Sequence, residues 1–387
     1  MASSNLGQAF RLATLNSWHG LAGGRRFLFD ALESQRAHRE RLERQVDSLA
    51  ALNAQVIFLQ EVNPLPVRAF WFAEKLKMRV FFATANQGMK LLWGPPFNLN
   101  EGIAILVPST WRAELLGKQL LSGNQLPSLI ELPGELGSFL SCQLTELRVA
   151  MAVRLHFPDD WNPAGFYGTR SILLINTHFH HGHWGSPANL GYLNDLVNSG
   201  YLKSKDSEKV LTLFRQSNSR RVAEAQRLTQ WISRIARPGE AVILGGDLNT
   251  EPYSPPVQEV RKIGFRDTWA SVTHDEKQES GHTWDPARNM AAFRSQTYHR
   301  YAQKYGRGIA ALYKKAELLP RRIDFIFDRA WNYAHTESAS LSEPFGQQPL
   351  GVMGLLDSVK MFPQPDKSPK KQIISDHFGL CATYRRD

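Results

Sequence analysis

The chain has 387 residues, of which 42% are hydrophobic, and it carries a formal net charge of +10 at pH 7. The hydrophobic content suffices for a large core, and length alone would permit two or three domains. The two cysteines, Cys142 and Cys381, are too few and too far apart for a disulfide framework or a structural zinc site. The basic charge favours a polyanionic partner without choosing among nucleic acid, an anionic membrane surface and a phosphorylated substrate.

The first twenty residues lack the basic start and apolar stretch of a signal peptide. No apolar run reaches the length of a membrane span, so any membrane contact is expected to be peripheral. The absence of a signal peptide and the low cysteine content favour a cytoplasmic location. We expect the chain to be a monomer.

Apolar runs in the N-terminal half predict short buried strands, at 10–15, 56–59, 80–85 and 102–107. Helices are predicted at 33–52 and 67–76, the first with Leu42, Val46 and Leu49 on its apolar stripe. The stretches 17–30 and 88–100 carry the glycine, proline and asparagine content of loops.

In the C-terminal half, strands are predicted at 148–156, 171–176, 241–244, 322–327 and 378–384. A helix is predicted at 217–237, where apolar residues recur every three or four positions. The region 180–213 is interpreted as a polar insertion, the pattern after Glu251 is irregular, and 344–371 is expected to form a flexible loop.

The chain contains no internal repeat and no clear linker. We therefore expect one domain over 1–387, with loop insertions near 86–100, 180–213, 271–320 and 344–371. Because β-α-β units mix with strand pairs, the expected fold class is α/β (α+β), with sheets inside and helices outside.

A carboxylate and an amide follow the predicted strand 241–244. Gly245 and Gly246 end this apolar run, and Asp247 and Asn249 come directly after them. Residues two apart on an extended chain point the same way, so the two side chains can share one hydroxyl, water or phosphate oxygen. Taken alone, however, this stretch is more typical of an Asx-rich turn.

The same arrangement recurs at, or near, the ends of six predicted strands. The polar residues concerned are Asn16, Glu61, His178, Asp247 with Asn249, Asp324, and Asp376 with His377. Any one of them is more often a surface or turn residue than a functional one. Because sheets place successive strand ends side by side, the six positions can converge on one crevice.

The residue types predict phosphate chemistry. Glu61 offers a hard oxygen ligand suited to Mg²⁺. A histidine beside a carboxylate, as in Asp376-His377, or one aligned by Asp324, can transfer protons near neutral pH. Asparagine and histidine donors can stabilise the charge of a phosphorane-like transition state.

Taken together, these residues resemble the endonuclease/exonuclease/phosphatase superfamily, which has the DNase I-like fold. The motifs that carry the resemblance are Asn16, Gln60-Glu61, Thr177-His178, Gly246-Asp247-Leu248-Asn249, Arg322-Ile323-Asp324 and Ser375-Asp376-His377. Their order and spacing match over nearly the whole chain. The resemblance implies a four-layer sandwich of two packed mixed β-sheets flanked by helices.

The resemblance also implies a role for each residue. Glu61 is the expected ligand of Mg²⁺, or of Mn²⁺ or another divalent cation, with Asn16 beside it and Asp376 as a candidate for a second metal. His377 and Asp247 are rival candidates for the general base, and Asp324 would orient His377. Asn249 and His178 would bind the phosphate, as would Asn16. The implied reaction is in-line attack of water on a phosphoric ester, with the metal as Lewis acid.

Three further segments resemble sphingomyelinases: 281–289, with its Thr-Trp-Asp-Pro-x-x-Asn pattern, Thr177-His178-Phe179-His180, and the helix segment 221–226. A packed loop is an equally good interpretation of the segment 281–289. The insertion 180–213 is longer than the family leads us to expect. His181 and His183 within it are interpreted as surface histidines rather than an extra metal site.

Three functions are compatible with these residues. The first is a Mg²⁺-dependent phosphodiesterase acting on a phospholipid head group, for which the apolar loop 91–97, with Trp93, would offer peripheral membrane contact or simply pack in the core. The alternative is a nuclease acting on DNA or RNA, whose phosphates would be tracked by Arg215, Arg220, Arg221, Arg227, Arg234 and Arg237. A non-catalytic binding protein is disfavoured because every acidic, Asn and His position of the constellation is filled.

Overall fold

The computed structural model describes residues 9–19, 21–22, 30–31, 34–86, 89–90, 101–123, 142–143, 147–159, 170–182, 187–272, 281–289, 319–330, 355–363 and 374–385. The predicted membrane-contact loop 91–97 and His183 lie outside these residues. So do most of the predicted insertions 271–320 and 344–371.

The first sheet has six strands and carries both ends of the described chain. In spatial order they are β15 (Leu355–Phe362), β16 (Gly379–Arg385), β1 (Phe10–Asn16), β4 (Val56–Val62), β7 (Glu101–Pro108) and β5 (Met78–Asn86). β1 and β4 run parallel and the other neighbours antiparallel, so the sheet is mixed.

The second sheet also has six strands. Their order is β13 (Arg266–Asp267), β14 (Asp324–Ala330), β12 (Ala241–Asp247), β11 (Ser171–His178), β10 (Arg148–His156) and β8 (Ala113–Ser122). β11 and β12 are the parallel pair. Two short pairs, β2 (Leu21–Ala22) with β3 (Asp30–Ala31) and β6 (Met89–Lys90) with β9 (Cys142–Gln143), lie apart from both sheets.

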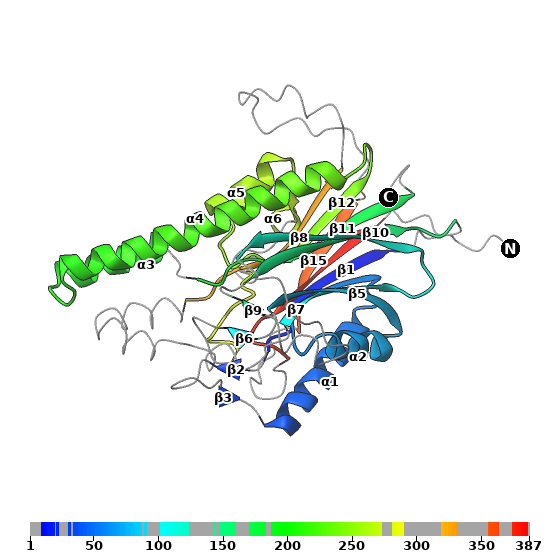
Figure 1. Ribbon diagram of the computed structural model, residues 1–387, viewed down its shortest axis with the longest axis horizontal. Helices are drawn as coiled ribbons and strands as arrows, with labels where there is room; N and C mark the ends of the chain where they lie inside the picture. The colour runs from blue at the N-terminus through cyan, green and yellow to red at the C-terminus, as the bar shows by residue number, and fades with distance from the viewer. Residues whose placement is uncertain are drawn as a thin grey trace.

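The two sheets pack face to face, with helices on both outer faces (Figure 1). Inward-facing residues such as Phe58 and Ile105 of the first sheet and Ile243 of the second form the central core. Against the first sheet lie α1 (Gln35–Ala51) and α2 (Val67–Leu76), and against the second lie α4 (Ser204–Ile235) and α5 (Pro255–Lys262). The predicted four-layer sandwich is confirmed, and both central parallel strand pairs read as nearly continuous apolar runs because both of their faces are buried.

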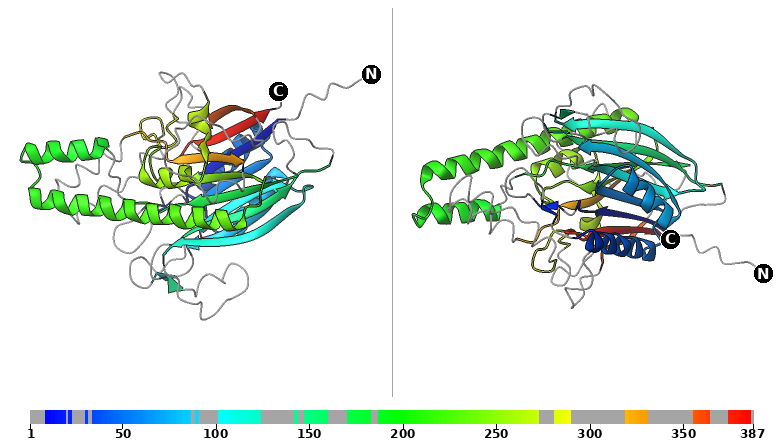
Figure 2. Two further views of the ribbon diagram at one scale, coloured as in Figure 1. Left: turned by 90° about the horizontal axis from the view of Figure 1, so that it is seen from above. Right: turned by 60° about the horizontal axis from the view of Figure 1, so that its bottom comes forward.

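The interpretation of 180–213 as a loop insertion was wrong for most of its length. This stretch forms α3 (Pro187–Asn198) and the start of α4, so the helix predicted at 217–237 begins at Ser204. The two helices form a hairpin that projects beyond the sheets (Figures 1 and 2). They bury Leu193 and Leu196 of α3 against Val210 and Phe214 of α4.

Other elements were also missed or misjudged. The predicted flexible loop 344–371 contains β15, and the irregular region after Glu251 contains α5, β13 and the short helix α6 (Thr268–Ser271). β8 was missed because its middle residues are exposed or half-buried, which weakens the apolar signal of a strand. The strand predicted at 322–327 begins at Asp324 and continues to Ala330. None of the described helices is long and apolar enough to cross a membrane.

Candidate functional site

Strand register brings the predicted site residues together at one end of the sandwich. In the second sheet, His178, Asp247 and Asp324 are direct partners on the neighbouring strands β11, β12 and β14. In the first sheet, Asn16 ends β1 beside Gln60 of β4. Loops that follow parallel strands leave from the same edge of a sheet, which is why residues far apart in sequence meet here.

Asn16 joins the two sheets at this edge. Its side-chain Nδ2 donates to Glu61 Oε1 at 3.1 Å and to Asp247 Oδ2 at 3.0 Å. Its Oδ1 accepts the backbone N–H of Trp18 at 3.0 Å. Asn16 is fully buried and therefore orients both carboxylates as a hydrogen-bond donor. Its predicted contacts with metal and substrate stay predictions.

A second bridge between the sheets lies directly beneath the site. Gln60 Nε2 donates to Asn176 Oδ1 at 2.7 Å and to Thr14 Oγ1 at 3.2 Å. Asn176 Nδ2 donates back to the backbone oxygens of Leu59 and Ala104, at 2.9 and 2.8 Å. These side chains are completely buried between the sheets, where a satisfied polar network fixes one arrangement more sharply than apolar packing does.

Glu61 reaches the site through a local irregularity of β4. The register with β7 shifts between Leu59 and Val62, which is a β-bulge, and Glu61 takes the left-handed conformation with φ +53°. The bulge turns Gln60 toward the opposite sheet and leaves Glu61 to the site. Burial opposes ionisation of Glu61, but His19, His178 and the Asn16 hydrogen bond outweigh it and lower its pKa to about 2. Glu61 is therefore a carboxylate at any physiological pH.

Gly246 lets β12 deliver Asp247 in close contact with β11. Its φ is +139°, and a Cβ at this position would lie 1.9 Å from the backbone oxygen of Thr177. Asp247 Oδ1 accepts the backbone N–H of Asn249 at 2.8 Å. Burial and the neighbouring Asp324 raise the pKa of Asp247 to about 7, against the opposing effect of His377.

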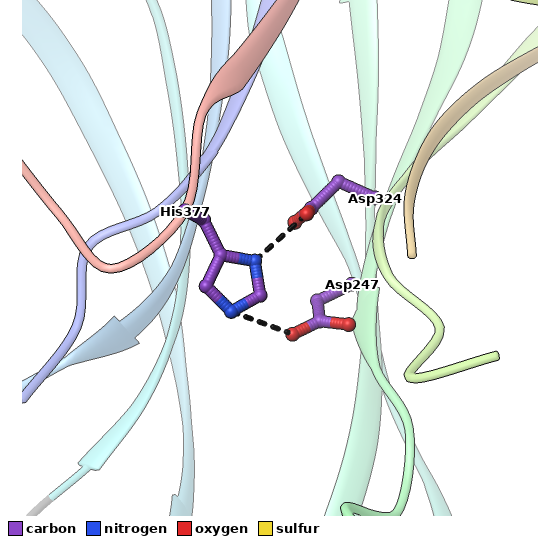
Figure 3. Close-up of side chains that lie close together, drawn as sticks. All are labelled: Asp247, Asp324 and His377. Atoms are coloured by element: carbon purple, nitrogen blue, oxygen red, sulfur yellow. Dashed lines mark hydrogen bonds and ion pairs between the residues drawn. The ribbon is translucent and has the colours of Figure 1, made fainter. Parts of the chain in front are cut away.

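His377 faces both aspartates of the second sheet (Figure 3). Its Nδ1 lies 2.8 Å from Asp324 Oδ2, and its Nε2 lies 3.9 Å from Asp247 Oδ2. Burial disfavours the imidazolium, but Asp324, Asp376 and Asp247 outweigh it and raise the pKa of His377 well above the ordinary value. Asp376, the residue before His377, is itself buried. Burial together with the neighbouring Glu61 raises the pKa of Asp376 to about 6.

The segment 281–289 supports this histidine. Thr283 Oγ1 accepts the backbone N–H groups of Ile323 and Asp324, both at 3.1 Å, and its backbone oxygen accepts the N–H of Phe378. The Trp284 ring packs edge-on against His377, with centroids 5.2 Å apart. Asn289 Nδ2 donates to the backbone oxygen of Ser375 at 2.8 Å. The pattern that resembled sphingomyelinases therefore frames the candidate site itself.

His178 is oriented by Arg148, a residue that sequence reasoning missed. Arg148 Nη1 lies 3.2 Å from His178 Nδ1. The guanidinium can only donate, so it fixes the orientation of the imidazole ring through Nδ1. The Nε2 of this ring lies 3.5 Å from Asp247 Oδ2 and 3.1 Å from the amide nitrogen of Asn249. His178 thus directs its Nε2 edge toward Asp247 and Asn249.

Two polar residues of α1 were also missed because they lie on a strongly charged helix. Arg41 and Gln45 are buried, and both donate to the backbone oxygens of Ser17 and Ile374. Ser375 Oγ in turn donates to the backbone oxygen of Asn16. These bonds tie the exit of β1 to the segment that carries His377. No sequence signal marks them, since they depend on tertiary contacts between distant segments.

Comparison with known proteins then decides the family. The model of the endonuclease/exonuclease/phosphatase family matches residues 13–377, a span that includes nearly every residue of the site. The chain belongs to the endonuclease/exonuclease/phosphatase family. Members are phosphoric ester hydrolases that typically depend on a divalent metal, and this chain is a phosphoric ester hydrolase with phosphodiesterase or nuclease-type activity. A search of curated proteins finds no match.

Solved structures of the family share the fold. An endonuclease/exonuclease/phosphatase from Bacteroides vulgatus matches with a TM-score of 0.53 and 13% identity, covering 98% of this chain and 100% of that one. A humanized TDP2 from D. rerio matches with a TM-score of 0.51 and 14% identity, covering 97% and 99%. D. rerio TDP2 complexed with a single-strand DNA product matches with a TM-score of 0.50, at the same identity and coverage.

The donor set at the family site fits a divalent cation. Asp247, Asp324 and His377 each offer a ligand atom, and these atoms lie within 4.8 Å of one another. Glu61 adds an ionised carboxylate at the facing sheet. One oxygen of Asp324, Oδ1, is buried and has no hydrogen-bond partner in the described part of the chain. The hard oxygen donors suit Mg²⁺ or Mn²⁺, whereas His377, kept protonated by its carboxylate neighbours, has no lone pair to offer a cation.

The helix proposed to track nucleic-acid phosphates is used largely for internal contacts. Arg221 is buried, Arg220 bonds to Ser122 and to the buried Glu224, and Arg227 donates to the backbone oxygen of Leu121. Glu224 also accepts the backbone N–H of His180 and so holds the turn that follows His178. Arg215, Arg234 and Arg237 remain exposed. His181 is exposed too, as interpreted from the sequence.

Proposed function

We propose that the chain is a divalent-cation-dependent phosphodiesterase that cleaves a polynucleotide by in-line attack of water. The observation that carries this proposal is the meeting of Glu61, from one sheet, with His178, Asp247 and His377 across the interface between the sheets. Such a group can hold a phosphate between a cation and several hydrogen-bond donors.

Glu61 would hold the cation, for which Mg²⁺ is the ion expected from the sequence and Mn²⁺ the alternative. When bound, the cation acts as a Lewis acid on a phosphate oxygen. Asp376 lies near Glu61 and is the candidate for additional coordination. The side chains of Asn249 and His178, whose Nδ2 and Nε2 lie 3.1 Å apart, would bind the non-bridging oxygens. Because the donors are fixed beforehand, little reorganisation is needed as charge develops.

Asp247 is the stronger of the two candidates for the general base. Its pKa of about 7 is matched to proton abstraction near neutral pH, whereas His377 is held as an imidazolium by its three carboxylate neighbours. Asp247 would take the proton of the attacking water. His377, oriented by Asp324, would donate a hydrogen bond from Nε2 to the phosphate.

Two observations support a polynucleotide as the substrate. The formal net charge of +10 favours a polyanion, since released counterions drive such binding. The similar TDP2 from D. rerio was solved as a complex with a single-strand DNA product. The phosphodiester linkage of DNA would fit the donors and the cation proposed for this site.

A phospholipid head group is the second candidate, because the segment 281–289 resembles bacterial sphingomyelinases. In this chain, however, Thr283 and Asn289 bond to the backbone around Asp324 and His377, and Trp284 is buried on His377. These contacts assign the segment to supporting the site, whichever ester it cleaves. The resemblance therefore supports a role of this segment in the phosphate site more than it supports a lipid substrate.

The test compares three substrates under one set of conditions: a labelled single-stranded oligonucleotide, plasmid DNA and sphingomyelin vesicles. We expect the purified chain to cleave DNA with Mg²⁺ or Mn²⁺ and to lose this activity in EDTA. Glu61→Gln should be inactive, and the exposed Glu43→Gln should match the wild type. Release of phosphocholine without DNA cleavage would replace the polynucleotide with the lipid. Cleavage that persists in EDTA would refute the metal dependence.

A further inference from the structure

His19 lies against the carboxylate expected to hold the cation. Its Nε2 is 3.6 Å from Glu61 Oε2, and its backbone N–H donates to the same oxygen at 3.3 Å. Two donor atoms bound to one ion at ligand distances near 2.1 Å lie roughly 3 Å apart. The separation between His19 and Glu61 is therefore close to that of a pair of ligands sharing a cation.

The backbone around His19 is held in place from behind. Trp18 takes the left-handed conformation with φ +54°, which turns the chain back toward Glu61. Buried Arg41 donates to the backbone oxygen of Trp18 at 3.2 Å, and its guanidinium lies over the Trp18 ring, 4.8 Å from the centroid. An imidazole carried on such a pinned turn has little freedom to lose when it binds an ion.

The side chain of His19 is 23% exposed, so solvent and ions reach it. This imidazole thus stands at the solvent-facing side of the Glu61 carboxylate.

We propose that His19 is a direct ligand of the catalytic cation, together with Glu61, and that it shifts the preference of the site from Mg²⁺ toward Mn²⁺. This inference rests on the proposed metal-dependent hydrolysis. Mg²⁺ strongly prefers oxygen donors and retained waters, whereas imidazole binds Mn²⁺ and later transition metals more readily. Replacing the imidazole by an amide oxygen should therefore weaken Mn²⁺ far more than Mg²⁺.

The test measures binding rather than turnover. Electron paramagnetic resonance of free Mn²⁺ gives its dissociation constant, and competition gives that of Mg²⁺. In His19→Gln we expect Mn²⁺ affinity to fall by about tenfold or more, the range typical for loss of a metal-site residue. Mg²⁺ affinity should fall much less. The spin-echo modulation from imidazole ¹⁴N in the Mn²⁺ complex should weaken as well.

His156→Gln is the matched control. His156 pairs with Ser171 at the start of β11, whereas His178 is the last residue of that strand, so His156 lies at the end of the sheet away from the site. A second variant, His19→Ala, should regain Mn²⁺ preference and ¹⁴N modulation when free imidazole is added. An unchanged ratio of Mn²⁺ to Mg²⁺ affinity in His19→Gln would overturn the inference while leaving the hydrolase intact. If the wild type binds neither cation, the inference and the proposed metal dependence both fail.

Discussion

His377 and Asp324 form a buried pair in which the imidazole Nδ1 lies 2.8 Å from the carboxylate Oδ2. The bond fixes the ring so that Nε2 faces Asp247. Asp324 is itself held by Thr283 through its backbone N–H. The pair thus spans the two sheets, since Asp324 begins β14 and His377 lies two residues before the start of β16.

Asp324→Asn should lower kcat by about 10²–10⁴-fold, because the amide no longer stabilises the imidazolium or fixes its ring. KM should change little, since Asp324 does not reach the substrate. Steady-state kinetics on the preferred substrate measure both constants. Asp47→Asn, on the exposed face of α1, is the control and should retain wild-type values. A kcat within threefold of the wild type would contradict the assigned role.

Asn176→Ala should destabilise the protein by roughly 3 kcal/mol, because buried polar groups lose their partners. The groups affected are the backbone oxygens of Leu59 and Ala104 and the side chain of Gln60. Urea unfolding monitored by tryptophan fluorescence gives the free energy. Asn198→Ala, exposed at the end of α3, should cost little. A loss below 1 kcal/mol for Asn176→Ala would show that the bridge does not hold the sheets.

We compare the unfolding free energy of Asp247→Asn with that of the wild type, both free of metal. The difference should favour the variant more strongly at pH 8 than at pH 5. The folded pKa of Asp247 is about 7 and its ordinary value 3.8, so between these pH values only the unfolded state has lost the proton. The contribution of Asp247 to the unfolding free energy of the wild type therefore falls as pH rises through that window. A shift of about three units corresponds to a change on the order of 2–4 kcal/mol.

Unfolding free energies of both proteins in EDTA, measured at pH 5 and pH 8, give this difference. Asp195→Asn, exposed on α3, should show no such pH dependence. An equal effect of Asp247→Asn at the two pH values would mean that the folded protein does not hold a raised Asp247 pKa. Asp247 would then be ionised throughout, and its role as the base near neutral pH would lose its main support.

The strands and the polar residues at their ends were predictable from local sequence. Buried strands such as β4 and β12 are short apolar runs, and a run that stops at Glu61 or Asp247 marks the strand end. Because register aligns neighbouring strand ends, residues at those ends were bound to meet. The prediction of the four-layer sandwich succeeded for this reason together with the family resemblance.

The remaining features depend on contacts that no local pattern encodes. The helices of the hairpin are stabilised by Leu193 and Phe214 packing on each other, although their exposed residues look like a polar insertion. Arg148 and Gln45 orient the site from a strand and a helix where charged and polar residues are ordinarily solvated. The left-handed turn at Trp18, which brings His19 to Glu61, also has no glycine to signal it.

The most direct test of a phosphodiesterase site between the two sheets is the kcat/KM of His377→Ala on the cleaved substrate, measured with saturating Mg²⁺ or Mn²⁺. We predict a loss of at least about 10³-fold, with circular dichroism and thermal unfolding close to those of the wild type. His156→Ala should keep the wild-type kcat/KM. A folded His377→Ala variant that retains activity within fivefold of the wild type would contradict the assignment.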